Sequence, residues 1–276
     1  MLVEFGFNGE LLTSQNATII IAYYLHKGGD SSPQSKSSIR KYLIHALLNG
    51  IYGSSQDQLL STLRNAFRTE IKQGDGTTSY QGRFTTLSFE DVLKIELPQQ
   101  KSLAVTETDL ERFLGHTKGP ASFFVLTLLY PHLRYNDAFF HQDHIHPFSG
   151  FTDEALKTMG IPEDQRAEWY ARRDCVPNLQ LLNDRRNISK NDTPITDWVK
   201  KMTDAQRAAF ISENYFPQDI GLEFKKFIAF FDQRKENLRI EMRKVLAMAP
   251  LQTDMTTTDT TWSRSESGLE ESEVEG

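Results

Sequence analysis

One stretch, between residues 141 and 190, constrains the fold of this chain more than any other part of the sequence. Residues 141–145 and 176–182 have the length and composition of two short strands, and a loop follows the first of them. A helix then begins near Asn183 or Asp184, because both residue types are good helix caps. The order strand, strand, helix predicts a ββα unit, in which side chains that are distant in sequence come together.

Polar residues occupy the key positions of this predicted unit. Asp143 and His144 lie at the end of the first strand, and Asn178 lies in the second. Asn187 and Lys190 follow in the helix. An imidazole can take a proton from water, while a neighbouring carboxylate and an oxygen donor from the helix can hold a divalent cation. The set therefore predicts metal-assisted hydrolysis.

The spacing of these residues resembles that of metal-dependent HNH endonucleases. The shared pattern is Asp-His-Ile-x-Pro, then Asn-Leu-Gln-x-Leu, then Asn with Lys three residues on. The resemblance implies that His144 is the general base and that Asn178 orients it through backbone contacts. It also implies that Asp143 and Asn187 are metal ligands, and that Lys190 lies near the phosphate. Phosphodiester hydrolysis in DNA is the activity that this resemblance implies.

The oxygen donors of the predicted site indicate which ion it would hold. Hard oxygen ligands, with water in the remaining positions, suit Mg²⁺ or Mn²⁺ better than a soft metal. Many HNH enzymes also bind a structural zinc through pairs of cysteines, but the equivalent positions here hold Asn183 and Arg186. No structural zinc is therefore expected. Cys175 is the only cysteine, so the chain cannot form an internal disulfide.

A long insert and several further polar residues surround the site. Residues 148–174 lengthen the connection between the strands and are expected to form two short helices, 152–159 and 162–172. Some neighbouring residues are candidates for contacts with the metal or the DNA, although hydrogen bonds that support the fold or simple solvation would also explain them. These are His141, His146, Arg172, Arg173, Arg185 and Arg186.

The rest of the chain has the hydrophobic spacing of helices. We therefore expect a mainly α fold with a small ββα-metal unit embedded in a helical body. A helix is expected at 222–247, where a basic stripe that includes Arg234 would either touch phosphates or form an ordinary solvated face. The expected division is a helical region (1–120), an HNH-like unit (121–200, insert 148–174), C-terminal helices (201–251) and a disordered acidic tail (252–276).

Charge and hydrophobicity exclude several classes of protein. The tail holds seven of the 37 acids and one of the 31 bases, so it accounts for the net charge of −6 and leaves the remainder balanced. With 38% apolar residues the chain can bury a core, which excludes disorder throughout. It has no apolar run long enough for a membrane span and no signal peptide, so a cytosolic protein that does not bind membranes is expected.

Most of residues 1–250 also resemble the C-terminal part of GmrSD-type restriction and phage-defence proteins. The supporting stretches are 38–43, 46–53 and 123–130. Full-length members carry an upstream ParB-like nucleotide-handling domain, whose Asp-Gly-Gln-Gln-Arg signature is not found here. The resemblance implies defence against foreign DNA, with a ParB-like domain on a separate subunit as one arrangement. Two alternatives are a DNA-binding or regulatory subunit of a split restriction system, and an inactive helical interaction module.

Overall fold

The computed structural model describes residues 1–5, 7, 12–135 and 138–248. Within these residues it has twelve α-helices and two two-stranded antiparallel sheets, which confirms the expected mainly helical fold. None of the helices described is both long enough and apolar enough to cross a membrane. The predicted acidic tail, residues 252–276, lies outside the described residues.

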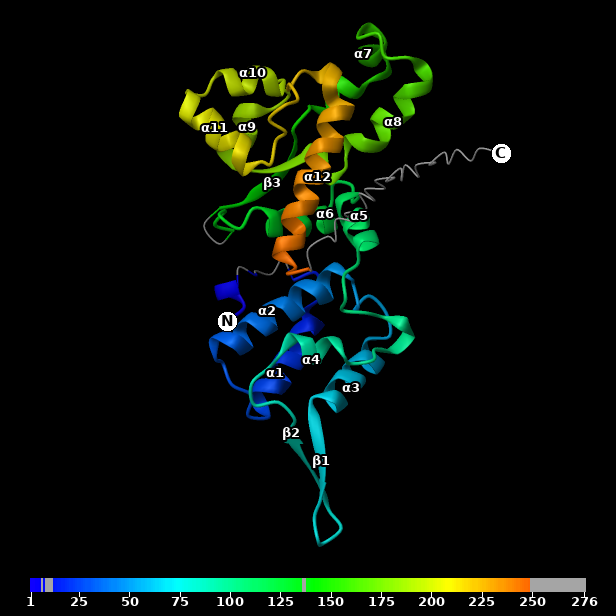
Figure 1. Cartoon of the computed structure of the whole chain (residues 1–276), viewed down its shortest axis with the longest axis vertical. Helices are drawn as coiled ribbons and strands as arrows, with labels where there is room; N and C mark the ends of the chain where they lie inside the picture. Colours follow the sequence, from blue (N-terminus) through cyan, green and yellow to red (C-terminus); the bar gives the residue numbers. More distant parts are fainter. Residues whose placement is uncertain (6, 8–11, 136–137, 249–276) are drawn as a thin grey trace, which may run out of the picture.

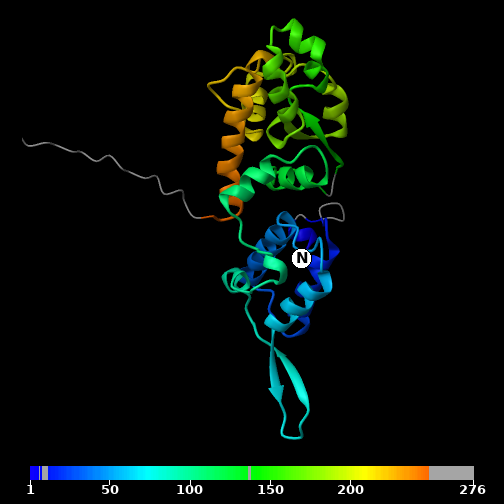
Figure 2. The same cartoon turned by 90° about the vertical axis from the view of Figure 1, so that its right-hand side faces the viewer.

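The elements fall into two lobes that α12 helps to connect (Figure 1). The α-helices are α1 (Ile19–His26), α2 (Pro33–Leu48), α3 (Gln56–Ala66), α4 (Phe89–Leu93), α5 (Glu107–Leu114), α6 (Pro120–Leu129), α7 (Asp153–Thr158), α8 (Glu163–Arg173), α9 (Asp184–Lys190), α10 (Ile195–Lys200), α11 (Asp204–Glu213) and α12 (Phe227–Val245). The strands are β1 (Arg68–Lys72), β2 (Thr78–Gly82), β3 (Phe140–His144) and β4 (Leu179–Asn183). The β1–β2 hairpin projects from the end farthest from α7 to α11, as Figure 2 also shows.

Helix starts in both lobes follow local capping signals. Thr106 accepts a hydrogen bond from the backbone N–H of Asp109, whose carboxylate accepts one from the backbone N–H of Thr106. Thr203 and Gln206 form the same reciprocal pair at the start of α11. Such capping boxes satisfy N–H groups that have no partner within the helix. Residues close together in sequence therefore determine where α5 and α11 begin.

Helix α12 packs into each of three buried apolar clusters. The largest cluster extends from the N-terminal helices through α6 and β4 to Leu238 of α12. Phe230 belongs to a second cluster around α10 and α11, and Phe227 to a third cluster under α7 and α8. Burial of these aromatic side chains removes much apolar surface from water. The helix therefore joins the regions on both sides of the ββα unit. The division of the chain expected at residues 120 and 200 stays a prediction.

Arg234 of α12 is fully buried and holds three elements together. Its guanidinium donates to the carbonyls of residues 176, 177 and 179, at 3.3, 2.6 and 3.0 Å, in the segment that leads into β4. It also donates to the hydroxyl of Tyr130, at 2.9 Å, and to the carbonyl of Asn214, at 2.9 Å. Burial lowers the pKa of Arg234 and raises that of Tyr130. The planar fork of the guanidinium can satisfy these acceptors together, which an ammonium cannot.

Two expectations from sequence were wrong in detail. The helix expected at 222–247 begins only at Phe227, after a 3₁₀ turn at Phe224–Lys226. Arg234 points into the protein and does not belong to a solvated stripe. From sequence alone, a charged residue in a helix is expected at the surface. Arg234 is buried instead, because distant segments supply hydrogen-bond acceptors for its guanidinium.

The β1–β2 hairpin was not predicted. Most of its residues are exposed, so the strands lack the alternation of apolar and polar residues that burial produces. Arg68 stacks on the ring of Tyr80 across the hairpin, with 3.6 Å between the guanidinium carbon and the ring centroid. Gly76 has a φ of +82° in the turn, a conformation that favours glycine. The run Gly74-Asp75-Gly76 was the signal from which the turn was predictable.

We predict that Arg234→Lys lowers the free energy of unfolding by roughly 2 to 4 kcal/mol, because a lysine leaves several buried carbonyls without a donor. Arg239→Lys on the same helix is the matched control, since Arg239 forms surface ion pairs with Glu236 and Glu107. That change is expected to alter stability by less than about 1 kcal/mol. Urea unfolding of both variants measures the difference, and equal losses would contradict the role given to Arg234.

Candidate active site

The predicted strand, strand, helix arrangement is present. Strands β3 and β4 pair antiparallel, with Asp143 opposite Gln180 and His144 opposite Leu179. Helix α9 follows β4 directly, and the side chain of Asn183 caps it by accepting from the backbone N–H of residue 186, at 3.0 Å. The second strand begins at Leu179 and not at residue 176, because Val176–Asn178 forms a 3₁₀ turn that contains a proline.

His144 forms a hydrogen-bonded pair with Asp174. Nε2 of His144 lies 2.8 Å from Oδ1 of Asp174, at the C-terminal end of α8. Arg173 donates to the other carboxylate oxygen from Nε, at 3.0 Å, and from Nη2, at 2.7 Å. An ionised carboxylate only accepts hydrogen bonds, so Nε2 of His144 carries the proton. The lone pair of the imidazole is therefore on Nδ1.

The surroundings keep this pair as a neutral imidazole and an ionised carboxylate. Burial lowers the pKa of His144, whose side chain is 13% exposed, and the hydrogen bond to Asp174 only partly offsets this effect. Burial alone would raise the pKa of Asp174, but hydrogen bonds from Arg173 and His144 bring it below its usual value. At neutral pH Nδ1 of His144 is thus free to accept a proton.

Sequence reasoning missed Asp174. It lies at the end of the insert, 30 residues from His144, and nothing in its local sequence distinguishes it from the other acids of the chain. The two helices predicted within the insert are present as α7 and α8. The backbone carbonyl of Asp174 accepts from the N–H of Lys118, in the loop before α6, at 2.8 Å, which ties the end of α8 to that loop. The insert thus supplies a site residue.

Asn178 is completely buried and joins the two segments that carry this pair. Its carboxamide donates to the carbonyls of His146, at 3.2 Å, and Arg173, at 2.7 Å, and accepts from the backbone N–H of His146, at 3.0 Å. Its own carbonyl accepts from the N–H of Ile145, at 2.8 Å. These contacts fix the backbone just after His144 and just before Asp174. They are of the kind expected of a residue that orients the base through the backbone.

Asp143 forms a buried ion pair with Lys190. Nζ of Lys190 lies 2.8 Å from Oδ2 of Asp143, and it also donates to the carbonyl of His144, at 2.6 Å. Gln180 donates to the same carboxylate oxygen from the facing strand, at 2.8 Å. The side chain of Lys190 is 0% exposed, so its ammonium neutralises Asp143 inside the unit. Both contacts are made to Oδ2, which leaves Oδ1 for another ligand.

Asn187 lies half-buried in the middle of α9. Its backbone carbonyl accepts from the N–H of residue 191, but its carboxamide has no hydrogen bond to any described residue. Among those same residues, no three or more His, Cys, Asp or Glu side chains are grouped closely enough to hold a metal ion. The structure thus joins His144 to Asp174 and Asp143 to Lys190, and it leaves Asn187 without a side-chain partner.

The remaining candidates have different environments. His141 is half-exposed and pairs with Asp184 at the start of α9. Arg172 forms ion pairs with Glu168, at 2.7 Å, and Asp232, at 2.6 Å. Arg173 holds Asp174 and stacks on the exposed ring of Phe148, with 3.9 Å between guanidinium carbon and ring centroid. Arg185 and Arg186 are exposed on α9 and have no ion pair within the described part of the chain.

His146 lies in an apolar environment behind the hairpin. It is 1% exposed, and the rings of Phe224, Phe227 and Phe230 meet its ring edge-on, at centroid distances of 5.6, 5.5 and 5.0 Å. Burial lowers the pKa of His146 to about 3, and the charges of Lys190 and Arg234 contribute. The imidazole is therefore neutral at neutral pH.

Comparison of the chain with known protein families and with curated proteins finds no match to either.

We predict that the stability of the protein falls as the pH is lowered from about 6.5 toward 4, in part because of His146. The folded pKa of about 3 lies below the ordinary value of 6.5, so the unfolded chain binds the proton first. Stability from this group is complete above the unfolded pKa and is lost as the pH falls toward the folded one.

The measurement is urea unfolding of the wild type and of His146→Phe between pH 7.5 and 4.5. As the pH falls, the free energy of unfolding should decrease more steeply in the wild type than in the variant, by up to about 1.4 kcal/mol per pH unit. His26→Phe is the control, because His26 is exposed. Parallel pH curves for wild type and His146→Phe would show that this histidine is not kept neutral by the fold.

Proposed function

We propose that this protein is an HNH-type endonuclease that hydrolyses phosphodiester bonds in DNA with the help of a divalent metal ion. One observation carries the proposal. At the end of β3, in a ββα unit, the neutral imidazole of His144 is held by Asp174 through Nε2, at 2.8 Å, and has its lone pair on Nδ1. A fixed histidine in this protonation state is the general base that hydrolysis by water requires.

Each of four residues has a different role in the proposed reaction. Nδ1 of His144 takes a proton from water as the water oxygen attacks phosphorus, and the bond to the 3′-oxygen breaks. Asp174 stabilises the positive charge that forms on the imidazole, while Arg173 keeps the carboxylate in place. Asn178 fixes the backbone on both sides of this pair. The proton then leaves His144 to solvent or to the departing oxygen.

The residues that would hold the metal ion are Asp143 and Asn187. Both offer hard oxygen donors, and Oδ1 of Asp143 is not used by Lys190 or Gln180. This donor chemistry fits Mg²⁺ or Mn²⁺, with water as the remaining ligands. When bound, such an ion would polarise the scissile phosphate and stabilise the leaving oxygen. The ion pair with Lys190 would have to loosen or share Asp143.

Several exposed residues of the ββα unit and of the loop after β3 suit contact with DNA. Arg185 and Arg186 stand on the surface of α9, where their charges can meet phosphates. Phe148 is 49% exposed, and its ring lies 6.0 Å from that of His144, so a base or sugar can stack on it. His141 lies on the same strand as His144 and is half-exposed. These side chains would position the scissile phosphate.

The cellular role that we propose is defence of a bacterial cytoplasm against foreign DNA, together with a separate ParB-like subunit. A second candidate function is that of a regulatory or DNA-binding subunit, or an inactive interaction module. The ion pair of Asp143 with Lys190 favours this alternative, because it occupies the carboxylate that a catalytic metal would need. Nuclease assays of the purified chain distinguish the two.

We predict that His144→Ala lowers the rate of cleavage of plasmid DNA in Mg²⁺ or Mn²⁺ by about 10² to 10⁴, the usual cost of losing a general base. Asp174→Asn should lower it by on the order of 10²-fold, because an amide holds the imidazole without stabilising its charge. His26→Ala should cleave like the wild type, since His26 is exposed in α1. Full activity of His144→Ala would remove this residue from the mechanism.

Metal binding gives a separate test. Mn²⁺ affinity measured by calorimetry should fall in Asp143→Ala and in Asn187→Ala, because each loses an oxygen donor. It should rise in Lys190→Met, because the ammonium no longer competes for Asp143. If all three variants bind Mn²⁺ like the wild type, the ion is held elsewhere. If Lys190→Met alone binds the ion, the regulatory alternative is favoured.

A further inference from the structure

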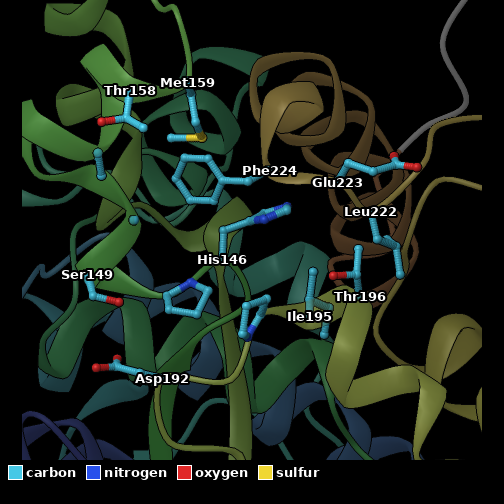
Figure 3. A pocket seen from close by; sticks show the side chains of 14 residues that line it. His146, Ser149, Thr158, Met159, Asp192, Ile195, Thr196, Leu222, Glu223 and Phe224 are labelled. Atoms are coloured by element: carbon cyan, nitrogen blue, oxygen red, sulfur yellow. The ribbon is translucent and has the colours of Figure 1, made fainter.

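A cavity of about 500 Å³ lies behind the loop that follows β3. Four segments of the chain form its walls: residues 146–150, α7 and the residue after it, the turn into α10, and residues 222–224. Figure 3 shows His146 and Phe224 projecting into it, with Met159 and Thr158 on one side and Ile195 and Leu222 on the other. This volume is in the range of sites for small organic molecules.

His146 places an unpartnered polar atom in this largely apolar wall. Its Nε2 is buried and has no hydrogen-bond partner among the described residues. Its backbone N–H and carbonyl are both bonded to Asn178, so the ring is held in position. A buried nitrogen without a partner costs free energy, which a ligand with a hydrogen-bonding group would recover.

The shape of the wall favours a flat ring. Phe224 lies over the cavity beside His146, with 5.6 Å between the two ring centroids. It can do so because residue 150 is glycine, where a Cβ atom would lie 2.6 Å from the ring of Phe224. Met159 and Pro147 complete the apolar lining. Aromatic rings pack well against phenylalanine, proline and the methionine thioether.

The charges around the cavity disfavour anions. No lysine or arginine lines it, while the carboxylates of Asp192 and Glu223 do. Asp192 is exposed, and Glu223 pairs with Lys226 at 3.5 Å. A phosphate or carboxylate on the ligand would therefore meet the negative charge of Asp192 and find no cation in the cavity lining.

We propose that this cavity binds an uncharged aromatic compound that presents an amide or hydroxyl group to the ring of His146. The site is separate from the proposed phosphodiester chemistry and does not depend on it. The two nevertheless share one loop, since His144 and Phe148 face the candidate active site while His146 and Gly150 line the cavity. Occupation of the cavity would stiffen the loop that follows the base.

Binding of 2-naphthamide and 2-naphthoate to the full chain tests the proposal, because these probes have nearly the same shape and differ in charge. Saturation-transfer NMR and calorimetry should show that the amide binds at least about tenfold more tightly than the carboxylate. Asp192→Asn should leave the affinity for the amide unchanged and strengthen binding of the carboxylate.

Two variants locate the binding site. His146→Phe keeps the aromatic packing and removes the ring nitrogens, so it should weaken the binding of 2-naphthamide by about tenfold or more. Thr158→Trp fills the cavity from an exposed position, so it should block the probe without disturbing the core. Thr69→Trp, on the exposed β1 strand, is the control.

Three results would overturn the proposal. They are the absence of binding by 2-naphthamide, equal affinity for the two probes, and unchanged affinity in Thr158→Trp. If His146→Phe fails to fold, Thr158→Trp and Asp192→Asn still decide the outcome, because both substitutions are at exposed positions.

Discussion

The buried guanidinium of Arg234 is the interaction on which the rest of the site depends. It ties α12 to the turn before β4, and that turn contains Asn178. Asn178 in turn holds the backbone beside His144 and beside Asp174. The position of the proposed base is thus set by a chain of hydrogen bonds that starts in a distant helix. The buried charge of Arg234 is compensated by hydrogen bonds to backbone carbonyls and to one tyrosine hydroxyl.

Local signals were enough to predict the framework of the site from the sequence. The hairpin strands, the cap at Asn183 and the two helices of the insert were all predictable, because caps and short apolar runs act within a few residues. The proximity of His144 and Asn178 was predictable only through the motif. The motif indicates that the two strands pair, and the register of that pairing determines which residues lie next to each other.

Contacts between distant segments were not predictable. Asp174, Arg234 and Lys190 are ordinary charged residues in sequence, and charge alone assigns them to the surface. Each is instead drawn inward by a specific partner: the His144 imidazole, a set of carbonyls, or the Asp143 carboxylate. Such partners become visible only when the fold has brought them together. The pairing of Lys190 with Asp143 matters most, because it decides how readily the unit accepts a cation.

The order of the segments along the chain has a consequence for how the protein forms during synthesis. The hairpin strands leave the ribosome well before Arg234, which lies 55 residues beyond Leu179. Until α12 has been synthesised, the carbonyls of the turn before β4 lack the hydrogen bonds from Arg234. The backbone around Asn178 is then not held in place by that side chain. The site is therefore completed only after α12 has been synthesised. A nascent chain would carry the residues of the site without its geometry.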